Sequence, residues 1–386
     1  MSDDLRDVAV VGGGPAGLVA ALLARRHGAS VTLIAPEAPP RDERTVAMLG
    51  ASVEILQETG IWASLEAKSA PLRTMRIVDA TRRLIRAPLV EFHAHEVGRE
   101  AFGYNIPNAV LIAALDEAIE QAGIERVTGF ASEILPSADS VRVVTTDGAI
   151  VRTKLLGAAD GRRSKAREAA GLAVRSWSYP QAALVANIAH SRPHDDVSTE
   201  FHTETGPFTI VPMPGLRSAI VCVESPAEAE RLSKLDDEAL AAEFERRSRS
   251  IVGKITIAGN RQVFPLSGQT ARHFAARRIA LIGEAAHVFP PIGAQGLNLG
   301  LRDAAAFAGV VRDHGADPGS AEALSAYDRA RIGDVLSRTT AVDALNRTLL
   351  TDFLPVQALR GVGLYAIDRL PKLKRLVMRQ GLTPHL

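Results

Sequence analysis

The stretch VAVVGGGPAG, residues 8–17, decides the fold of this 386-residue chain. Its first four residues form the apolar run of a short buried strand, and the next segment, residues 18–26, is rich in Ala and Leu and has helical character. A second strand is expected over residues 30–34. This order of strand, glycine-rich turn, helix and strand is the βαβ pattern of a doubly wound α/β sheet.

The turn contains the spacing Gly12-x-Gly14-x-x-Gly17. Gly12 permits the tight turn, Gly14 lets the backbone approach a pyrophosphate, and Gly17 lets helix and strand pack closely. The pattern alone is weak, but between a strand and a helix near the N-terminus it indicates a dinucleotide site, which would also include Pro15 and Ala16. The structural alternative is a glycine-rich turn without a ligand.

The composition is that of a globular protein with two domains: 46% of residues are apolar and 23% are charged. The net charge of +1 gives no global field that would attract nucleic acid. Cys222 is the single cysteine, which excludes an internal disulfide and a cysteine-built metal site and fits a reducing cytoplasm. We expect no signal peptide and no membrane-spanning segment, and therefore a soluble or peripheral protein.

The strand pattern changes along the chain and predicts two interleaved domains. A Rossmann-type domain is assembled from separated pieces, and a mostly antiparallel β-sheet domain with one clear helix, residues 235–247, is inserted between them. The expected boundaries are 1–70, 100–175 and 269–326 for the dinucleotide-binding pieces, 71–99 and 176–268 for the inserted substrate domain, and 327–386 for C-terminal helices.

The acidic residue that usually follows the second strand is missing. Ala35 stands where an acid, about 20 residues beyond the glycine turn, holds the ribose hydroxyls. Glu37 lies two residues later, either as a substitute or as a solvated loop charge. Arg44 is predicted to open a helix over residues 44–58, where it either pairs with a diphosphate or is an ordinary surface residue.

Two further motifs place carboxylates at strand ends. In GAADGRRS, residues 157–164, Asp160 either reaches into a cofactor cleft or caps a helix together with Ser164. In ALIGEAAHVFPPIGAQGLNLGLRDA, residues 280–304, Gly283 and Glu284 end a buried strand before the chain turns into a helix whose free N–H groups can face an anion.

The same stretch contains Asn298 within the first turn of that helix, and His287 before it. His287 is either catalytic or, as we favour, a hydrogen-bonded residue that shapes the turn. Asn108 is expected to cap a helix over residues 109–121. Three such turns spread over the whole chain require one long ligand, and a dinucleotide with a ribityl tail has the necessary length.

These motifs resemble those of the aromatic-ring (class A) flavin monooxygenases. The three FAD-contacting motifs of that family are similar to VAVVGGGPAG, GAADGRRS and RRIALIGEAAHVFPPIGAQGLNLGLRDA. The segments DERTVAML and WSYPQAALVANIAHSRPH are similar to the hydroxylases of ubiquinone biosynthesis. The resemblance covers most of the chain.

The resemblance implies that NAD(P)H, bound transiently, reduces FAD, and that O2 is then used to hydroxylate an aromatic ring, here a prenylated phenol intermediate of ubiquinone biosynthesis. Glu284 would bind the ribityl chain, and Pro291 with 294–298 would lie against the isoalloxazine. The substrate would lie between this turn and strands from 177–188, 201–213 and 218–223. The residues implied to contact FAD are Gly12, Gly14, Pro15, Ala16, Gly17, Arg44, Asn108, Asp160, Gly283, Glu284, Pro291, Ala294, Gln295, Gly296, Leu297 and Asn298.

Several positions depart from the family pattern. Glu284 replaces the usual Asp, Ala294 replaces a Gly, Ala35 replaces the ribose acid, and Cys222 stands where relatives often carry Trp. The departures at Glu284, Ala294 and Ala35 leave open a FAD-binding scaffold subunit of a biosynthetic complex. Two further alternatives are a hydroxylase of a small soluble phenol or natural product and a reductase of prenyl double bonds.

The C-terminal sequence RLPKLKRLVMRQGLTPHL, residues 369–386, contains five basic residues and no acid. A basic amphipathic helix here would associate with the cytoplasmic face of a membrane or with a biosynthetic complex, which suits a prenylated substrate. The alternative is a terminal helix that packs on its own domain. The five basic residues are Arg369, Lys372, Lys374, Arg375 and Arg379.

Overall fold

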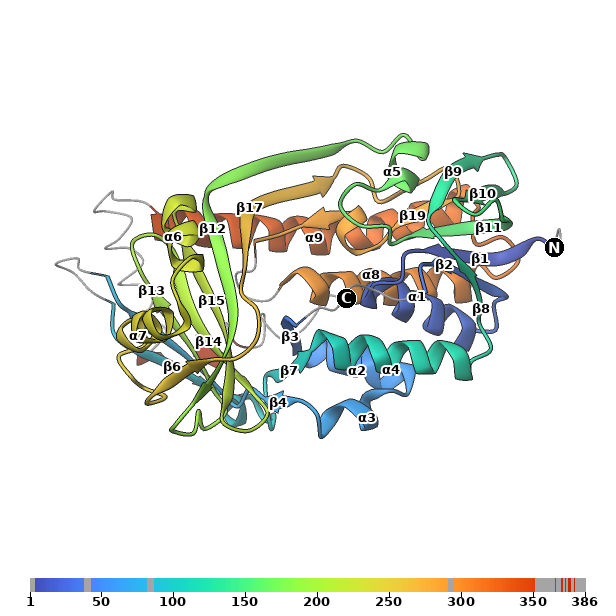
Figure 1. Cartoon of the computed structure of the whole chain (residues 1–386). Coiled ribbons are helices and arrows are strands. Elements are labelled where there is room, and N and C mark those ends of the chain that lie inside the picture. Colours follow the sequence, from blue (N-terminus) through green and yellow to red (C-terminus); the bar gives the residue numbers. More distant parts are fainter. Residues whose placement is uncertain are drawn as a thin grey trace.

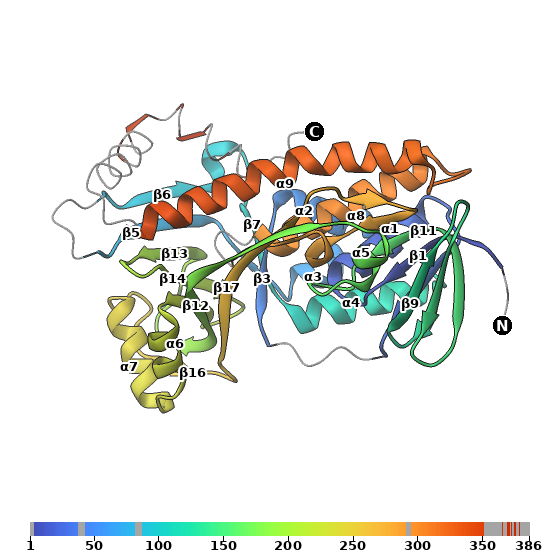
Figure 2. The same cartoon turned by 90° about the horizontal axis from the view of Figure 1, so that it is seen from above.

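The chain forms two halves that share three long elements. Figure 1 shows strands β12 (Val174–His190) and β17 (Gln262–Ala271) extending from one half into the other, and Figure 2 shows helix α9 (Ala321–Leu350) running along both. The side chains of α9 are described as far as residue 338. The computed structural model describes residues 4–37, 43–81, 87–290, 295–350, 365, 369–370, 372, 374–375 and 378.

The first sheet has the strand order β18–β19–β11–β1–β2–β8 among the described residues, with β10 and β9 continuing from β11. Strands β19, β11, β1, β2 and β8 are parallel, and the inner four consist largely of buried Val, Leu, Ile and Ala because helices cover both faces of such sheets, whereas β8 at the edge has no buried residue. The strands are β1 Arg6–Val11, β2 Val31–Ala35, β8 Glu125–Thr128, β9 Ala131–Pro136, β10 Val141–Thr145, β11 Ile150–Ala158, β18 Ala275–Ala276 and β19 Ile279–Leu281.

Helix α1 (Pro15–Arg26) connects β1 to β2 and lies at the centre of this half. Pro15 occupies its first turn, where the missing N–H costs nothing, and the residues from Gly17 to Ala24 are all buried. Burial on all sides follows because α1 packs on the sheet, on α8 and on α4. The other helices of this half are α2 Gly50–Thr59, α3 Trp62–Glu66, α4 Asn108–Gln121, α5 Lys165–Ala169 and α8 Gln295–Asp313.

The second sheet has the order β20–β17–β12–β15–β14–β13–β5–β6, with β16 beside β12. Its pairs are antiparallel except β13 with β5. Helices α6 (Pro226–Ser233) and α7 (Asp237–Arg247) cover one face, where Phe208 packs between Phe201 and Phe244. The remaining strands are β5 Thr74–Asp79, β6 Val90–His93, β13 Val197–His202, β14 Pro207–Met213, β15 Arg217–Glu224, β16 Ile255–Ile257 and β20 His287–Val288.

A small sheet joins the two halves. It consists of β3 (Thr45–Leu49), β7 (Gly103–Pro107) and β4 (Ala70–Pro71) in the order β3–β7–β4. The buried side chain of Asn105 on β7 donates a hydrogen bond of 2.7 Å to the backbone oxygen of Pro212 on β14. Two short 3-10 turns complete the structure, η1 Ala94–Val97 and η2 Gly283–Ala285.

The predicted fold class is confirmed: a Rossmann-type α/β half, an inserted and mostly antiparallel sheet, and a C-terminal helical segment. The strands of the first sheet come from three separated stretches, 6–35, 125–158 and 275–281. Each stretch lies within one predicted piece, while the domain boundaries themselves stay a prediction. Within the described parts of the chain, no helix is long and apolar enough to cross a bilayer.

Three local predictions were wrong. Residues 44–58 form strand β3 followed by α2 rather than one helix, because the β-branched Thr45 and Val46 favour a strand and β7 supplies a partner. The inserted domain has a second helix, α6, whose start is marked by Ser225, which accepts a hydrogen bond from the Glu228 N–H. Asn108 is the first residue of α4 rather than its cap.

Candidate cofactor and substrate site

The first and second motifs touch at Gly12. Its φ of +117° suits glycine, and a Cβ at this position would overlap the backbone oxygen of Ala159, the residue before Asp160. A Cβ at Gly17 would in turn overlap the backbone oxygen of Gly12. Strand β1, helix α1 and the end of β11 therefore approach at backbone distance; the close packing at Gly17 was predicted, and the contact of Gly12 with Ala159 was not.

The third motif meets the first at Ala16. A Cβ built on Gly300 of α8 would lie 3.2 Å from the Ala16 Cβ and 3.3 Å from the Gly283 Cα. Gly283, with φ +62°, follows strand β19 and allows this approach. The structure thus brings together three motifs that span 8–17, 157–164 and 280–304.

The start of α1 is open. Gly14 is exposed, and nothing in the described structure lies within 4 Å of a Cβ built there. The first turn of α1 contains no acidic residue, so its unpaired N–H groups present a partial positive charge without competition. A diphosphate fits this position because its backbone donors are free to face an anion.

The end of β2 offers no carboxylate. Ala35 is buried, and its Cβ would lie 3.0 Å from a Cβ built on Gly13, so a methyl group fills the space between strand and turn. Glu37 is exposed two residues later, where both sequence alternatives for it stay open.

Asp160 uses its two oxygens differently. Oδ2 accepts a hydrogen bond of 3.1 Å from the Ala166 N–H in the first turn of α5, and Ser164 caps the same helix by accepting from the Arg167 N–H. The other oxygen, Oδ1, is buried and has no hydrogen-bond partner among the described residues. Helix capping therefore accounts for only half of the carboxylate, and the remaining acceptor is available to a ligand.

Glu284 lies on the η2 turn directly after β19. Its side chain is exposed although the flanking Gly283 and Ala285 are buried, so the turn presents one carboxylate at the end of the strand. Acceptor oxygens at this position suit the hydroxyl groups of a polyol chain.

Residues Gln295 to Asn298 are the first four residues that the structure describes in α8, and N–H groups in the first turn of a helix point out of its start. Gly296 is exposed with open space around a Cβ built there, and Leu297 packs partly against the core. Pro291 and Ala294 lie outside the described residues. A helix start of this kind can donate to carbonyl oxygens of a flavin ring.

The side chain of Asn298 is committed to β3. Its Oδ1 accepts from the Leu49 N–H and its Nδ2 donates to the Ala47 oxygen, both at 2.8 Å. Asn298 thereby fastens the start of α8 to the small sheet, so its side chain serves the scaffold.

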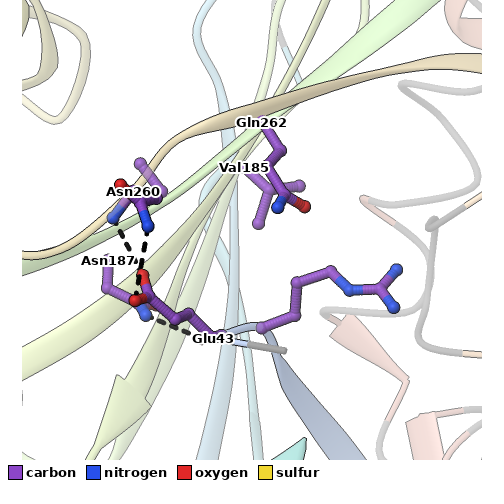
Figure 3. A pocket seen from close by; sticks show the side chains of 7 residues that line it. Glu43, Val185, Asn187, Asn260 and Gln262 are labelled. Atoms are coloured by element: carbon purple, nitrogen blue, oxygen red, sulfur yellow. Dashed lines mark hydrogen bonds between the residues drawn. The ribbon is translucent and has the colours of Figure 1, made fainter. Parts of the chain in front are cut away.

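Arg44 precedes β3 and lines a polar cavity of about 160 Å³ between this strand and the second sheet. Its guanidinium lies 5.4 Å from the ring centre of Phe264, and its backbone oxygen accepts from the Asn108 N–H. Figure 3 shows Glu43 pointing to Asn260, whose N–H donates to it at 2.8 Å. The other lining residues are Val185, Ala186, Asn187 and Gln262.

His287 is buried beneath the third motif. Its Nε2 lies 2.6 Å from the Oδ2 of Asp303, and both side chains are fully buried. The same Asp303 oxygen accepts from the Gly283 N–H, and the other accepts from Arg331 Nε. This geometry favours the structural interpretation of His287, which shapes the turn.

Asp303 belongs to a buried network that sequence reasoning missed. Burial would raise the pKa of Asp303, but its interactions with His287 and the Arg331 guanidinium outweigh burial and lower the pKa below its ordinary value. Arg331 also donates to Asp334, whose pKa is likewise lowered by Arg331 and Arg302 against the effect of burial. A signal existed in the sequence, because 327, 331, 334 and 338 fall on one face of a helix yet include three charges.

The two faces of the second sheet bury different sets of side chains. Cys222 and Leu184 pack in the core under α7, and burial raises the Cys222 pKa to about 12. Adjacent positions on the same strands point to the opposite face, where Ala183 and Val223 form an apolar cluster with Leu266. The departure at Cys222 therefore concerns the helix-covered core.

The described residues of the C-terminal segment divide into two groups. Lys374 pairs with Glu96 at 2.7 Å, and Met378 is buried against Ala94 and Phe102. The other group is exposed and includes two large apolar side chains. Its members are Tyr365, Arg369, Leu370, Lys372 and Arg375; Arg379 lies outside the described residues.

Comparison with known proteins gives full-length matches. A family model described as FAD binding domain matches residues 6–336. Ubiquinone hydroxylase UbiL of Rhodospirillum rubrum is 34% identical, with 99% of this chain and 90% of the relative covered. The 3-demethoxyubiquinol 3-hydroxylase of Escherichia coli is 29% identical, with 99% and 100% covered. The solved structure of p-nitrophenol 4-monooxygenase PnpA from Pseudomonas putida has the same fold, with a TM-score of 0.79, 19% identity and 99% of both chains covered.

Proposed function

We propose that this chain, which belongs to the FAD-binding domain family and is an FAD-dependent monooxygenase using NAD(P)H and O2, hydroxylates the ring of a prenylated phenol intermediate of ubiquinone biosynthesis. The observation that carries the proposal is the 34% identity to a ubiquinone hydroxylase over 99% of this chain and 90% of the relative. Both halves of the molecule take part in that similarity, so the cofactor half and the substrate half are matched together.

The residues present fit FAD. Gly14 and Gly296 leave open space at two helix starts, and Asp160 Oδ1 is a buried acceptor without a partner among the described residues. FAD, when bound, supplies electron transfer from NAD(P)H and the activation of O2. The protein itself binds and orients the cofactor and the substrate, and it excludes water from the site.

We assign a protein group to each part of FAD. The N–H groups at the start of α1, behind Gly14, bind the diphosphate, and Arg44 stands near it as a cation. Glu284 accepts hydrogen bonds from the ribityl hydroxyls through an exposed carboxylate. The N–H groups at the start of α8 donate to the ring oxygens and stabilise negative charge there.

The substrate ring would lie against the face of the second sheet opposite α7. This face has the apolar cluster of Ala183, Val223 and Leu266, with Tyr179 and Val221 packed partly against it. An apolar wall keeps water from the reacting atoms and suits a prenylated aromatic ring. Cys222 does not contribute to it, because its side chain lies in the core under α7.

The test is product formation. Purified protein loaded with FAD would be supplied with NAD(P)H, O2 and a phenol that carries a short prenyl chain, with the same phenol lacking the chain as the matched control. We expect a hydroxylated prenylated product by mass spectrometry, with at least about tenfold lower kcat/KM for the control because apolar chain burial is lost. Equal turnover of both phenols would contradict the prenylated substrate, and NAD(P)H oxidation without product from either would contradict the hydroxylase.

We further propose that the exposed part of the C-terminal segment docks on an anionic membrane surface, from which a prenylated substrate would be drawn. Lys374 and Met378 hold the segment on the substrate half, while Arg369, Lys372 and Arg375 stay exposed next to Tyr365 and Leu370. Basic side chains attract anionic headgroups, and the exposed aromatic and aliphatic groups can enter the interface.

Reversing two of these charges should weaken membrane binding. Each basic residue at an anionic surface contributes ~1 kcal/mol, so Lys372→Glu with Arg375→Glu should lower the partition onto phosphatidylserine vesicles by about 30-fold or more. Vesicle co-sedimentation measures the effect, and Lys234→Glu with Lys254→Glu, two exposed lysines of the inserted domain, gives the same change in net charge. Equal loss in both double variants would show that net charge, and not this segment, determines binding.

A further inference from the structure

Gly283 and Gln295 are the two ends of a segment within the third motif, and both are connected to side chains of α9, Gly283 indirectly through Asp303 of α8. At one end, Gly283 donates its N–H to Asp303, and Asp303 accepts from Arg331 Nε at 2.7 Å. At the other end, the Gln295 side-chain oxygen accepts from Arg338 Nη1 at 3.2 Å. The two ends lie twelve positions apart in the sequence, yet both connect to one helix.

A single carboxylate joins the two connections. Asp334 accepts from Arg331 Nη1 at 2.9 Å through one oxygen and from Arg338 Nε at 3.0 Å through the other. Arg302 of α8 donates to the second oxygen at 2.7 Å. The chain of contacts therefore runs from Gly283 through Asp303, Arg331, Asp334 and Arg338 to Gln295.

The network lies where apolar residues would be expected. Residues 327, 331, 334 and 338 share one face of α9, and the side chains of Arg331, Asp334 and Arg302 are each at most 10% exposed. Tyr327 at the end of this row donates to the Leu281 oxygen on β19 at 2.6 Å. Buried charge pairs of this kind seldom stabilise more than apolar packing would, whereas they fix geometry closely.

We propose that Arg338 and Asp334 are positioning residues for the flavin site: they set the places of Gln295 and Gly283, the two ends of the motif that faces the isoalloxazine and ribityl groups. The inference rests on the proposed function, because residues that touch no ligand can position a flavin site only if the third motif binds FAD. Arg338 is the sharper test, because it contacts both Asp334 and Gln295 through different nitrogens.

Arg338→Lys separates positioning from stability. Lys keeps the positive charge beside Asp334 but lacks the fork that reaches a second acceptor, so the contact to Gln295 is lost while the ion pair remains. We expect FAD affinity, measured by quenching of flavin fluorescence, to fall about tenfold, the size of one charged hydrogen bond. The melting temperature of the FAD-free protein should stay as in the wild type.

The matched control is Arg329→Lys, the same change on the exposed side of the same helix, where Arg329 donates a hydrogen bond to Ser325. It should alter neither quantity. A second variant, Gln295→Leu, should weaken FAD to a similar degree, and the double variant Gln295→Leu/Arg338→Lys should lose no more than the stronger single one, because Arg338 acts through Gln295.

The outcomes separate the inference from the function. Wild-type protein that does not bind FAD would overturn the proposed function itself. Wild-type binding with unchanged affinity in Arg338→Lys, or additive losses in the double variant, would overturn the positioning role alone. In Arg338→Lys we also expect more hydrogen peroxide per NAD(P)H oxidised, because a displaced flavin transfers oxygen less efficiently to substrate.

Discussion

Asp303→Asn should lower the free energy of unfolding by about 3–5 kcal/mol. Asp303 is fully buried and accepts hydrogen bonds from Gly283, His287 and Arg331. Removing its charge leaves the Arg331 guanidinium buried with Asp334 as its remaining carboxylate partner in the described structure. Urea unfolding followed by circular dichroism measures the loss.

The control for this prediction is Asp313→Asn on the same helix. Asp313 pairs with Arg312 at 2.8 Å, but both side chains are more than half exposed, so its loss should leave the urea midpoint unchanged. A comparable destabilisation in both variants would mean that the buried Asp303 network contributes no more to stability than an exposed ion pair does.

The effect of Asp303 should also depend on pH in a defined direction. Its pKa is lowered in the folded state, so the stabilisation is fully present above the unfolded value of about 3.9 and is lost as the pH falls through the lower folded pKa. The difference between wild type and Asp303→Asn should therefore be constant between about pH 5 and 8 and shrink below about pH 4. A difference that grew on acidification would contradict the assigned charge state.

Gly12→Ala and Gly14→Ala should fail in different ways although they lie two residues apart. At Gly12 the φ of +117° and the overlap with the Ala159 oxygen should cost about 3 kcal/mol or more of folding stability. At Gly14 the backbone is extended, with φ −77°, and no described atom lies near the new Cβ, so stability of the FAD-free protein should change by less than ~0.5 kcal/mol.

For FAD affinity, the informative variant is Gly14→Ala. The methyl group of Gly14→Ala would lie where the diphosphate meets the start of α1, and loss of two charge-assisted hydrogen bonds should weaken FAD about 100-fold. Thermal unfolding without FAD and fluorescence titration with FAD separate the two effects. Unchanged FAD affinity in a well-folded Gly14→Ala protein would mean that the diphosphate binds elsewhere.

The parts of the fold that follow from local sequence were predicted well. The glycine turn at Gly12 and the ends of β11 and β19 depend on short apolar runs followed by glycine, and these signals are contained within about ten residues. The predicted family, FAD cofactor and hydroxylase class are confirmed by a family model over residues 6–336 and by a relative matched over 99% of the chain. Strand β3 was missed because a five-residue strand depends on its distant partner β7.

The row of charges on α9 was visible in the sequence, but its partners behind the third motif could not be predicted from residue types alone. Asp303 and Arg331 lie 28 positions apart, and nothing local shows that α8 and α9 would bury them against each other. The roles of individual cofactor residues stay predictions for the same reason: Asn298, expected at the flavin, turns out to use its side chain on β3. A side chain in a motif can serve the scaffold while its backbone serves the ligand.

The two halves are connected by paired strands rather than by flexible linkers. Strand β12 leaves the first half at Val174 and ends in the second at His190, with β17 hydrogen-bonded beside it for most of that length. Such a ribbon resists the hinge opening that enzymes with linker-joined domains use to admit substrate. It also means that exchanging whole domains between relatives would require cuts inside a registered strand pair at β12 and β17. New substrates would have to be accommodated by replacing side chains on the inner face of the sheet.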